Sequence, residues 1–359
     1  MKAAILKAFG TPLAVETVAD PVLGTGEVIV DVVATPVLAY AREEFSGARN
    51  FLFDTPAIPG AGAIGRVRAA GPDATRLKVG DWVYCDPTVR SRDGGAMPGI
   101  LLQGLSAGGP GGQELQKHFH DGSFAQQMRL PTENAIPIGA INALDATRWC
   151  ALGRLLVPYG GFLAADLKSG EIVLVNGATG AFGGAAVAVA LAMGASFVVA
   201  TGRNAAALAD IEQRFGPRLR TVQMLGDEAG DRARILAIAP GPIDCVFDIL
   251  PPAATSTQVR TAIMTVRPYG RAVLMGGVGM LGGEDLALPY PWIMRNLITV
   301  RGQWMYDAAA IPGLVGLVRG GLLDLGHWAL TAFPLTEANA AVAHAAANAG
   351  PFKLTVLKP

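Results

Sequence analysis

The sequence predicts an α/β protein of two domains, one rich in β-strands and one built on a doubly wound parallel sheet. Three observations support this fold class. The chain has 359 residues, which is about the length of two domains. Short β-rich runs separated by Gly, Pro and Asp dominate residues 1–138. From about Asp145 buried strands alternate with helices, a pattern typical of βαβ units with a parallel sheet.

Composition and cysteine usage exclude several classes of protein. The 29 basic residues balance the 29 acidic residues, so we expect no nucleic-acid partner. No apolar run approaches the length of a membrane span, so we expect no membrane partner. The three cysteines (Cys85, Cys150 and Cys245) include no CxxC pair, which favours a reducing compartment and a cytoplasmic location.

In the first domain we expect strands, one helix and a long irregular loop. The strands are Ala3–Leu6, Glu27–Ala34, Gly65–Ala70, Trp82–Cys85 and Phe124–Leu130. The helix is Ala39–Phe45, which follows Pro36. The Gly-rich segment 97–121 is long for a loop in a compact domain, so we expect a functional lid or a flexible insertion.

The second domain is expected to alternate strands and helices. The strands are Ile172–Asn176, Phe197–Thr201, Leu219–Gln223, Cys245–Leu250, Ala272–Gly276 and Leu297–Gln303. The helices are Gly183–Met193, Ala205–Phe215 and Ser256–Val266. The tail adds helices at Ile311–Gly320 and Glu337–Ala347 and an edge strand at Lys353–Leu357. We assign residues 1–138 and 306–359 to the β-rich domain and residues 139–305 to the parallel-sheet domain.

A Gly-rich turn joins the strand Ile172–Asn176 to the apolar helix Gly183–Met193. Its residues are Gly177, Ala178, Thr179, Gly180, Ala181, Phe182 and Gly183. Gly180 lets the backbone approach a pyrophosphate, and Gly183 lets the helix pack closely on the strand. Free N–H groups and the helix dipole hold phosphate charge. This context predicts a dinucleotide site, with an ordinary tight turn as the alternative.

The end of the next strand distinguishes the two nicotinamide dinucleotides. An NAD enzyme places Asp or Glu there, on the ribose 2′-hydroxyl, whereas this chain has Thr201, Gly202, Arg203 and Asn204. Arg203 can pair with a 2′-phosphate, and Thr201 and Asn204 could add hydrogen bonds. The sequence therefore predicts NADPH (NADP) as the cofactor. A solvated loop cation is the alternative interpretation of Arg203.

Several segments together resemble the medium-chain dehydrogenase/reductase superfamily. They are Pro59–Gly60, Val79–Val83, Asp121–Ala125, Leu167–Val175, Gly180–Gly183, Asp244–Asp248, Gly270–Val273 and Lys353–Lys358. The resemblance covers nearly the whole chain and rests on the order and spacing of these segments. It implies a GroES-like β-rich catalytic domain, a Rossmann domain and a homodimer.

The zinc alcohol dehydrogenases of this superfamily carry a Cys-His pair and a Gly-His-Glu. The corresponding stretches, Thr35–Ala39 and Gly60–Gly62, contain no such ligand. Cys150 falls where such enzymes place a third ligand, but one thiolate cannot hold a catalytic zinc. We therefore expect no metal and interpret Cys150 as a small core residue. The structural-zinc lobe of four cysteines is also absent, and segment 97–121 takes its place.

The zinc-free branch of quinone oxidoreductases and enone reductases carries Asn-Pro-Val-Asp-x-Tyr-x-Arg. Thr35–Arg42 resembles it, with matches at Pro36, Val37, Tyr40 and Arg42 and with Thr35 and Leu38 at the Asn and Asp positions. This implies hydride transfer from NADPH to a quinone or a conjugated enone. Tyr40 is our catalytic candidate, because its hydroxyl could donate to an anionic oxygen. Aromatic packing is the alternative for Tyr40.

Two further segments are assigned to the nicotinamide half of the cofactor. Thr35 is expected near the nicotinamide ribose. The backbone of Met275, Gly276, Gly277 and Val278 is expected to hold the carboxamide, because these residues follow a strand of the parallel sheet. An ordinary strand-to-loop turn is the alternative for this segment.

Two other functions stay open on the same fold. One is a zinc-free carbonyl or imine reductase with a small-molecule substrate. The other is a non-catalytic NADPH-binding protein, such as a sensor, since fold alone does not determine function. His118, His120 and Asp121 have no standard metal or catalytic spacing, and we interpret them as exposed or structural.

Overall fold

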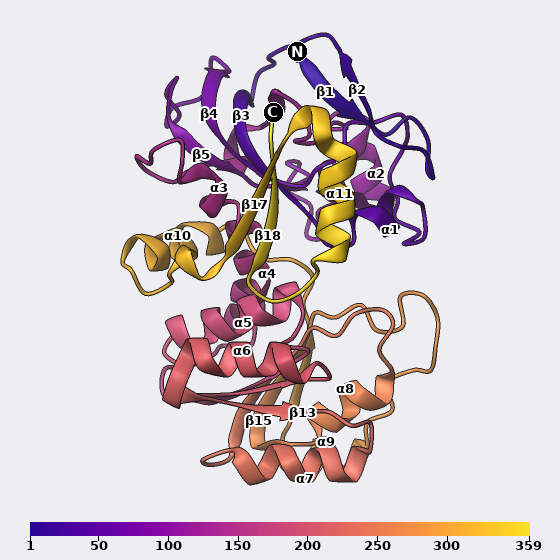
Figure 1. The fold of residues 1–359 in the computed structure, drawn as a ribbon, viewed down its shortest axis with the longest axis vertical. Helices are drawn as coiled ribbons and strands as arrows, with labels where there is room; N and C mark the ends of the chain where they lie inside the picture. The colour runs from indigo at the N-terminus through magenta and orange to yellow at the C-terminus, as the bar shows by residue number, and fades with distance from the viewer. The chain divides into compact units, whose positions relative to one another are not determined.

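The computed structural model describes all residues, 1–359, and the chain divides into two compact units (Figure 1). The first unit contains Met1–Gly153, Leu325–Ala349 and Lys353–Pro359, and the second contains Arg154–Asp324 and Gly350–Phe352. These limits differ from the domain boundaries expected at residues 138 and 306. Residues 139–153 join the first unit because α3 (Ala146–Trp149) contacts β3 (Glu27–Val37) and β4 (Ala63–Ala70). Residues 306–324 join the second unit, where the buried Tyr306 packs against Gly160.

The first unit is built on a seven-stranded sheet with the strand order β10-β5-β4-β3-β18-β17, and β9 pairs with β3. Besides β3 and β4, its strands are β5 (Trp82–Cys85), β9 (Gln127–Pro131), β10 (Ala135–Pro137), β17 (Ala329–Pro334) and β18 (Lys353–Lys358). Alternate residues of β3, such as Val28 and Val30, are fully buried in the core of this sheet. The prediction that Lys353–Leu357 forms an edge strand was wrong. β18 lies between β3 and β17, and β17 forms that edge.

A second core of the first unit lies under the N-terminal hairpin and the C-terminal helix. The hairpin pairs β1 (Lys2–Ile5) with β2 (Ala14–Thr17). Helices α1 (Ala41–Phe45) and α11 (Ala338–Ala347) contact each other, and α11 also contacts β18, beside which it is drawn in yellow in Figure 1. Buried Leu6, Phe45, Phe124 and Leu357 belong to this core.

Segment 97–121 folds, together with the preceding Thr88–Arg90, into a small lobe, so the expectation of an irregular loop was wrong for most of the segment. The lobe contains a three-stranded sheet of β6 (Thr88–Arg90), β7 (Ile100–Leu102) and β8 (Ser106–Gly108), followed by α2 (Pro110–Gln116). It folds because Val89, Leu101, Ala107 and Phe119 form a small buried core of their own. The high glycine content of the segment hid this core in the sequence.

The second unit has a six-stranded parallel sheet with the order β13-β12-β11-β14-β15-β16, which confirms the doubly wound fold class. Its strands are β11 (Ile172–Asn176), β12 (Phe197–Gly202), β13 (Leu219–Gln223), β14 (Ile243–Asp248), β15 (Val266–Leu274) and β16 (Thr299–Gly302). Its helices are α4 (Leu152–Ala164), α5 (Ala181–Ala192), α6 (Ala205–Phe215), α7 (Glu228–Ile238), α8 (Ser256–Ile263), α9 (Tyr290–Asn296) and α10 (Ala310–Arg319).

The central strands of this sheet are largely apolar and buried because helices cover both of its faces (Figure 1). Helix α5 connects β11 to β12 and helix α6 connects β12 to β13, and α7 and α8 contact each other. Short 3₁₀ turns occur at Thr132–Asn134, Gly216–Arg218, Leu325–His327 and Leu335–Glu337. None of the helices has both the length and the apolar character needed to cross a membrane.

Candidate functional site

The Gly-rich turn lies between the carboxyl end of β11 and the start of α5. Gly177 has a φ of 93°, a backbone conformation in which a residue with a side chain would be strained, so glycine is required there. The amide of Ala178 donates to the carbonyl of Thr201 on β12 at 2.8 Å. The amide of Gly180 donates to the carbonyl of Gly177 at 3.1 Å. The turn is therefore held in place by one hydrogen bond within its own backbone and by another to the neighbouring strand.

Two glycines allow the close packing around this turn. A Cβ on Gly183 would lie 2.0 Å from the carbonyl oxygen of Gly177, so only glycine lets α5 start there. A Cβ on Gly202 would lie 2.4 Å from the side chain of Thr179. Gly180 differs, because its Cβ would meet only the Gly177 carbonyl, at 3.5 Å. The space beside Gly180 is therefore open on the outer side of the turn.

The start of α5 suits an anion. No side chain caps this helix, and its first turn carries no acidic residue. Uncapped N–H groups at a helix start attract phosphate groups through hydrogen bonds and the helix dipole. The turn and the helix start therefore have the features that the predicted pyrophosphate site requires, and the binding of a dinucleotide there stays a prediction.

Arg203 lies directly after β12 with its side chain exposed and without a partner inside the chain. Its backbone carbonyl accepts a hydrogen bond from Gln223 Nε2 at 3.1 Å, which fixes its position. Asn204 caps α6 by accepting from the amide of Ala207 at 3.1 Å. Thr201, by contrast, is fully buried, so its hydroxyl supports the sheet and does not face outward. Arg203 is the free cation at this strand end.

A buried polar relay that the sequence analysis missed lies beneath the turn. Thr201, Asn176 and Asp248 are direct neighbours in register on β12, β11 and β14. The hydroxyl of Thr201 donates to Asn176 Oδ1 at 2.9 Å, and Asn176 Nδ2 donates to Asp248 Oδ1 at 2.7 Å. Burial raises the pKa of Asp248 to about 6, although hydrogen bonds from Asn176 and the Leu250 amide oppose this. A polar residue at the end of each apolar strand run was the available sequence signal.

The segment Met275–Val278 follows β15 as expected, but part of its backbone is already engaged. The amide of Met275 donates to the carbonyl of Asp248 at 2.9 Å, and the amide of Gly277 donates to that of Leu250 at 2.8 Å. A Cβ on Gly276 would lie 2.9 Å from Asp248 Oδ2. The amides of Met275 and Gly277 are therefore already used, and a contact with the carboxamide of the nicotinamide would have to come from other backbone groups of this segment. All of these cofactor-site residues lie in the second unit.

In the first unit, Thr35 and Ser123 form a buried pair of hydroxyls 2.6 Å apart, and Thr35 Oγ1 also donates to the carbonyl of Gly62 at 3.0 Å. The hydrogen bond from Thr35 to Gly62 joins the two stretches in which the zinc branch carries its ligands. The buried thiol of Cys150 donates to the carbonyl of Ala146 within its own helical turn. No group of three or more His, Cys, Asp or Glu side chains could hold a metal ion. The residues present therefore do not fit a zinc.

Tyr40 lies half-buried at the start of α1, and its ring is held from two sides. The guanidinium of Arg49 lies 4.2 Å from the ring centroid, and Phe51 meets the ring edge-on at 6.4 Å. Arg49 is itself fixed by an ion pair with Glu43 at 2.9 Å. The ring orientation of Tyr40 is therefore set by its neighbours within the first unit.

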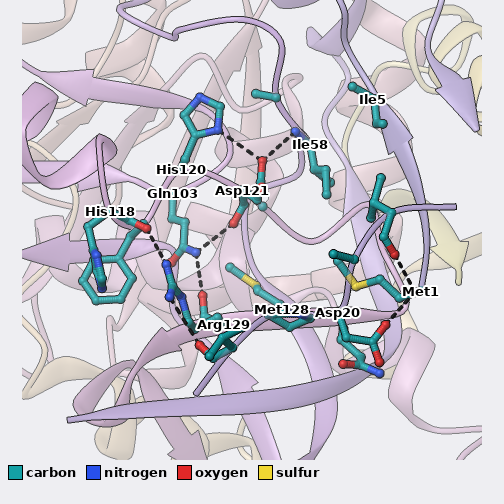
Figure 2. Close-up of a pocket in the computed structure, with 18 of the residues that line it drawn as sticks. Met1, Ile5, Asp20, Ile58, Gln103, His118, His120, Asp121, Met128 and Arg129 are labelled. Carbon is teal, nitrogen blue, oxygen red and sulfur yellow. Dashed lines mark hydrogen bonds and ion pairs between the residues drawn. The ribbon is translucent and has the colours of Figure 1, made fainter. Parts of the chain in front are cut away.

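The two histidines of interest line a hollow of about 530 Å³ in the first unit (Figure 2). His120 Nδ1 lies 3.2 Å from Asp121 Oδ1, and its Nε2 lies 3.1 Å from the carbonyl of Asp54. The hydrogen bond with Asp121 raises the pKa of His120 against the effect of burial. His118 bonds the buried carboxylate of Glu27 at 2.5 Å. Both rings therefore tie loops of this unit together, in agreement with a structural role.

Two family models match the chain over separate segments. An alcohol dehydrogenase GroES-like domain model matches residues 24–140, and a zinc-binding dehydrogenase model matches residues 181–319. The first match lies in the first unit, and the second match lies in the unit with the parallel sheet.

Curated relatives carry dehydrogenase names. An L-threonine 3-dehydrogenase of Ruegeria pomeroyi is 30% identical over 259 residues, which is 69% of this chain and 68% of the relative. An alcohol dehydrogenase of Rhizobium meliloti is 29% identical over 84% of both chains. An L-threonine 3-dehydrogenase of Streptomyces coelicolor is 25% identical over 98% of this chain and 97% of its own.

Solved structures share the fold over the full chain. An alcohol dehydrogenase from Escherichia coli, solved with NADH, has a TM-score of 0.80 at 17% identity and covers 100% of this chain and 99% of its own. A protein from Sinorhizobium meliloti described as a zinc-binding dehydrogenase, solved with NADP, has a TM-score of 0.77 at 20% identity with the same coverage. At these identities the likeness shows the fold alone.

Proposed function

Because this chain belongs to the medium-chain dehydrogenase/reductase superfamily, we propose that it is a zinc-independent, NADPH-dependent reductase of quinones or conjugated enones. An oxidoreductase with a nicotinamide cofactor follows from the family. The finer assignment is supported above all by one observation. Thr35, in a stretch where the zinc branch carries a ligand, is a buried hydroxyl bonded to Ser123 and to the Gly62 carbonyl.

The choice of NADPH is supported by Arg203. Its guanidinium is exposed, lacks a partner in the chain and follows the strand end at which the adenosine ribose is expected. No acidic residue stands between Thr201 and Asn204 to accept a ribose 2′-hydroxyl. A guanidinium can pair with a 2′-phosphate through two parallel hydrogen bonds.

The mechanism follows from what the side chains can supply. When bound, the reduced nicotinamide provides a hydride. Without a Lewis acid at the acceptor oxygen, the chain must stabilise the developing anion by hydrogen bonding. Quinones and enones need less stabilisation, because their conjugated system spreads the negative charge. We assign Tyr40 as the donor to the anionic oxygen, since Arg49 and Phe51 hold its ring in place.

A second candidate is a zinc-free carbonyl reductase, favoured by the alcohol and L-threonine dehydrogenase names of the relatives. Such a reaction turns a ketone into an alcohol and localises the negative charge on one oxygen. It therefore demands more from the hydrogen-bond donors of the site than quinone reduction does.

We also propose a homodimer that forms through the second unit and a cytoplasmic location. Strand β16 is an edge of the parallel sheet, so one side of its backbone is open to pairing. Around it, Met294, Leu297 and Trp304 are each at least half exposed. The three free and buried cysteines suit a reducing compartment.

The test is oxidation of NADPH and NADH by EDTA-dialysed protein with quinones, enones, aldehydes and cyclic imines. Turnover with NADPH and a quinone, or with an enone that yields a saturated C–C bond, is the expected result. A new alcohol or amine as the sole product would favour a carbonyl or imine reductase. Saturable NADPH binding without turnover of any acceptor would contradict the proposed reductase.

A further inference from the structure

The relay of Thr201, Asn176 and Asp248 has a defined direction. Thr201 and Asn176 each leave at most 1% of their surface exposed, and Asp248 leaves 2%. Because the Thr201 hydroxyl donates to Asn176 Oδ1, the amide of Asn176 can present only its Nδ2 to Asp248. The relay therefore fixes the orientation of the Asn176 side chain.

This relay touches both segments assigned to the dinucleotide. Asn176 immediately precedes Gly177, the first residue of the phosphate-binding turn, and its carbonyl accepts from the amide of Ile249 at 3.1 Å. At the other end of the relay, Asp248 Oδ2 faces Gly276, where a Cβ would lie 2.9 Å from it. One buried chain of side chains thus links the ends of neighbouring strands on which the cofactor is expected to lie.

The Asp248 carboxylate has no cation to balance it. The groups that face it are the Asn176 amide, the Leu250 backbone amide and the backbone of Gly276, none of which is charged. From α8, the carbonyl of Gln258 contacts the same Asn176 amide at 3.4 Å and is also neutral. Burial of an unpaired charge is costly, which accounts for the raised pKa of this group.

We propose that Asp248 is a positioning residue of the dinucleotide site, which orients Asn176 beneath the phosphate-binding turn and in its ionised form opposes the phosphates there. This inference rests on the proposed use of a nicotinamide dinucleotide. Binding of the dinucleotide anion then favours neutral Asp248, so that a proton is taken up on binding. Affinity falls as the pH rises through the range in which Asp248 ionises.

The first variant is Asp248→Asn, which keeps the size and the acceptor oxygen but removes the charge. We measure the Kd of NADPH and NADH at pH 5.5 and pH 8 by quenching of tryptophan fluorescence and by calorimetry. The variant is expected to bind about three- to tenfold more tightly than the wild type at pH 8 and nearly equally at pH 5.5. NADH is included because the 2′-phosphate of NADPH titrates in the same range.

Two further variants separate charge from orientation. Asp248→Ala removes the acceptor as well as the charge, so Asn176 loses its partner, and binding is expected to be about tenfold weaker than in Asp248→Asn at both pH values. Asp244→Asn is the matched control, because it removes a carboxylate from the same strand, about 13 Å away, where Asp244 pairs with Arg267. Its Kd relative to the wild type is expected to stay constant with pH.

The outcomes distinguish this inference from the cofactor assignment. Saturable wild-type binding with an Asp248→Asn ratio that does not change with pH would overturn the inference alone. An equal effect in Asp244→Asn, or equal affinities of Asp248→Ala and Asp248→Asn at both pH values, would also overturn it. Absence of dinucleotide binding by the folded wild type would overturn the cofactor assignment and the inference together.

Discussion

The hydroxyls of Thr35 and Ser123 lie 2.6 Å apart, and both side chains are fully buried. Thr35 uses its only proton to donate to the Gly62 carbonyl, so Ser123 must be the donor of the shorter bond. Two neutral hydroxyls and a backbone carbonyl therefore satisfy one another at this position. A catalytic zinc needs three protein ligands of another kind, chiefly thiolate, imidazole or carboxylate.

We therefore predict that metal removal changes neither stability nor turnover. Protein dialysed against EDTA should contain less than about 0.1 zinc per chain and keep its Tm within about 1 °C, because no ligand set ties folding to a metal. Elemental analysis and thermal unfolding before and after dialysis measure this. Stoichiometric zinc that survives dialysis, or activity restored only by added zinc, would contradict the prediction.

Arg203→Ala should lower the affinity for NADPH about tenfold to a hundredfold and leave that for NADH nearly unchanged. The reason is that the lost guanidinium recognises only the 2′-phosphate. Arg214→Ala is a suitable control, since Arg214 lies on the neighbouring α6 in an ion pair with Asp210. Titration of both dinucleotides measures the difference. An equal loss of affinity for NADH would show that Arg203 acts through the fold of the strand end.

The two glycines of the turn should respond differently to alanine. Gly183→Ala places a Cβ 2.0 Å from the Gly177 carbonyl, so it should lower the unfolding free energy by about 1–3 kcal/mol. Gly180→Ala has only an ordinary contact at 3.5 Å, so it should fold normally yet weaken both dinucleotides. Urea unfolding and dinucleotide titration separate the two effects. Normal dinucleotide binding by Gly180→Ala would place the phosphates elsewhere.

Asp248 should also make the stability of the free protein depend on pH. Its pKa is about 6 in the folded chain against an ordinary 3.8, so the folded state holds the proton more tightly. Stability from this group is present below about pH 4 and falls as the pH rises through 6, by about 3 kcal/mol in all. Asp248→Asn should remove that fall, as measured by urea unfolding between pH 4.5 and pH 7.5. Parallel pH curves for both proteins would refute the assignment.

Trp304→Glu should convert a homodimer into a monomer. Trp304 is half exposed just beyond the open edge of β16, so a charge there would be buried without a partner on pairing. Light scattering coupled to size exclusion measures the mass. Met97→Glu, at the most exposed large apolar residue of the first unit, is the control and should stay dimeric. A monomeric wild type would reject the proposed dimer.

Strands of the parallel sheet could be predicted well because they are buried on both faces. Such strands are largely apolar runs: Ile172–Asn176 was placed at its observed limits, and Phe197–Thr201 ends one residue before the observed strand. The weakly patterned helices α7 and α9 and the edge strand β17 were missed. Residues 97–121 were misjudged because a core of four buried side chains organises the lobe, and its glycines mask that core.

The sequence by itself determined the Gly-rich turn, the presence of Arg203 without an acidic neighbour at its strand end and the lack of zinc ligands, because these depend on residue types within short stretches. The tertiary structure alone decided which polar residues share an environment. Asn176 is separated in the sequence by 25 residues from Thr201 and by 72 residues from Asp248. The three nevertheless lie in register on adjacent strands. The alignment of parallel strands depends on the packing of the whole sheet, so no local pattern reveals that these side chains meet.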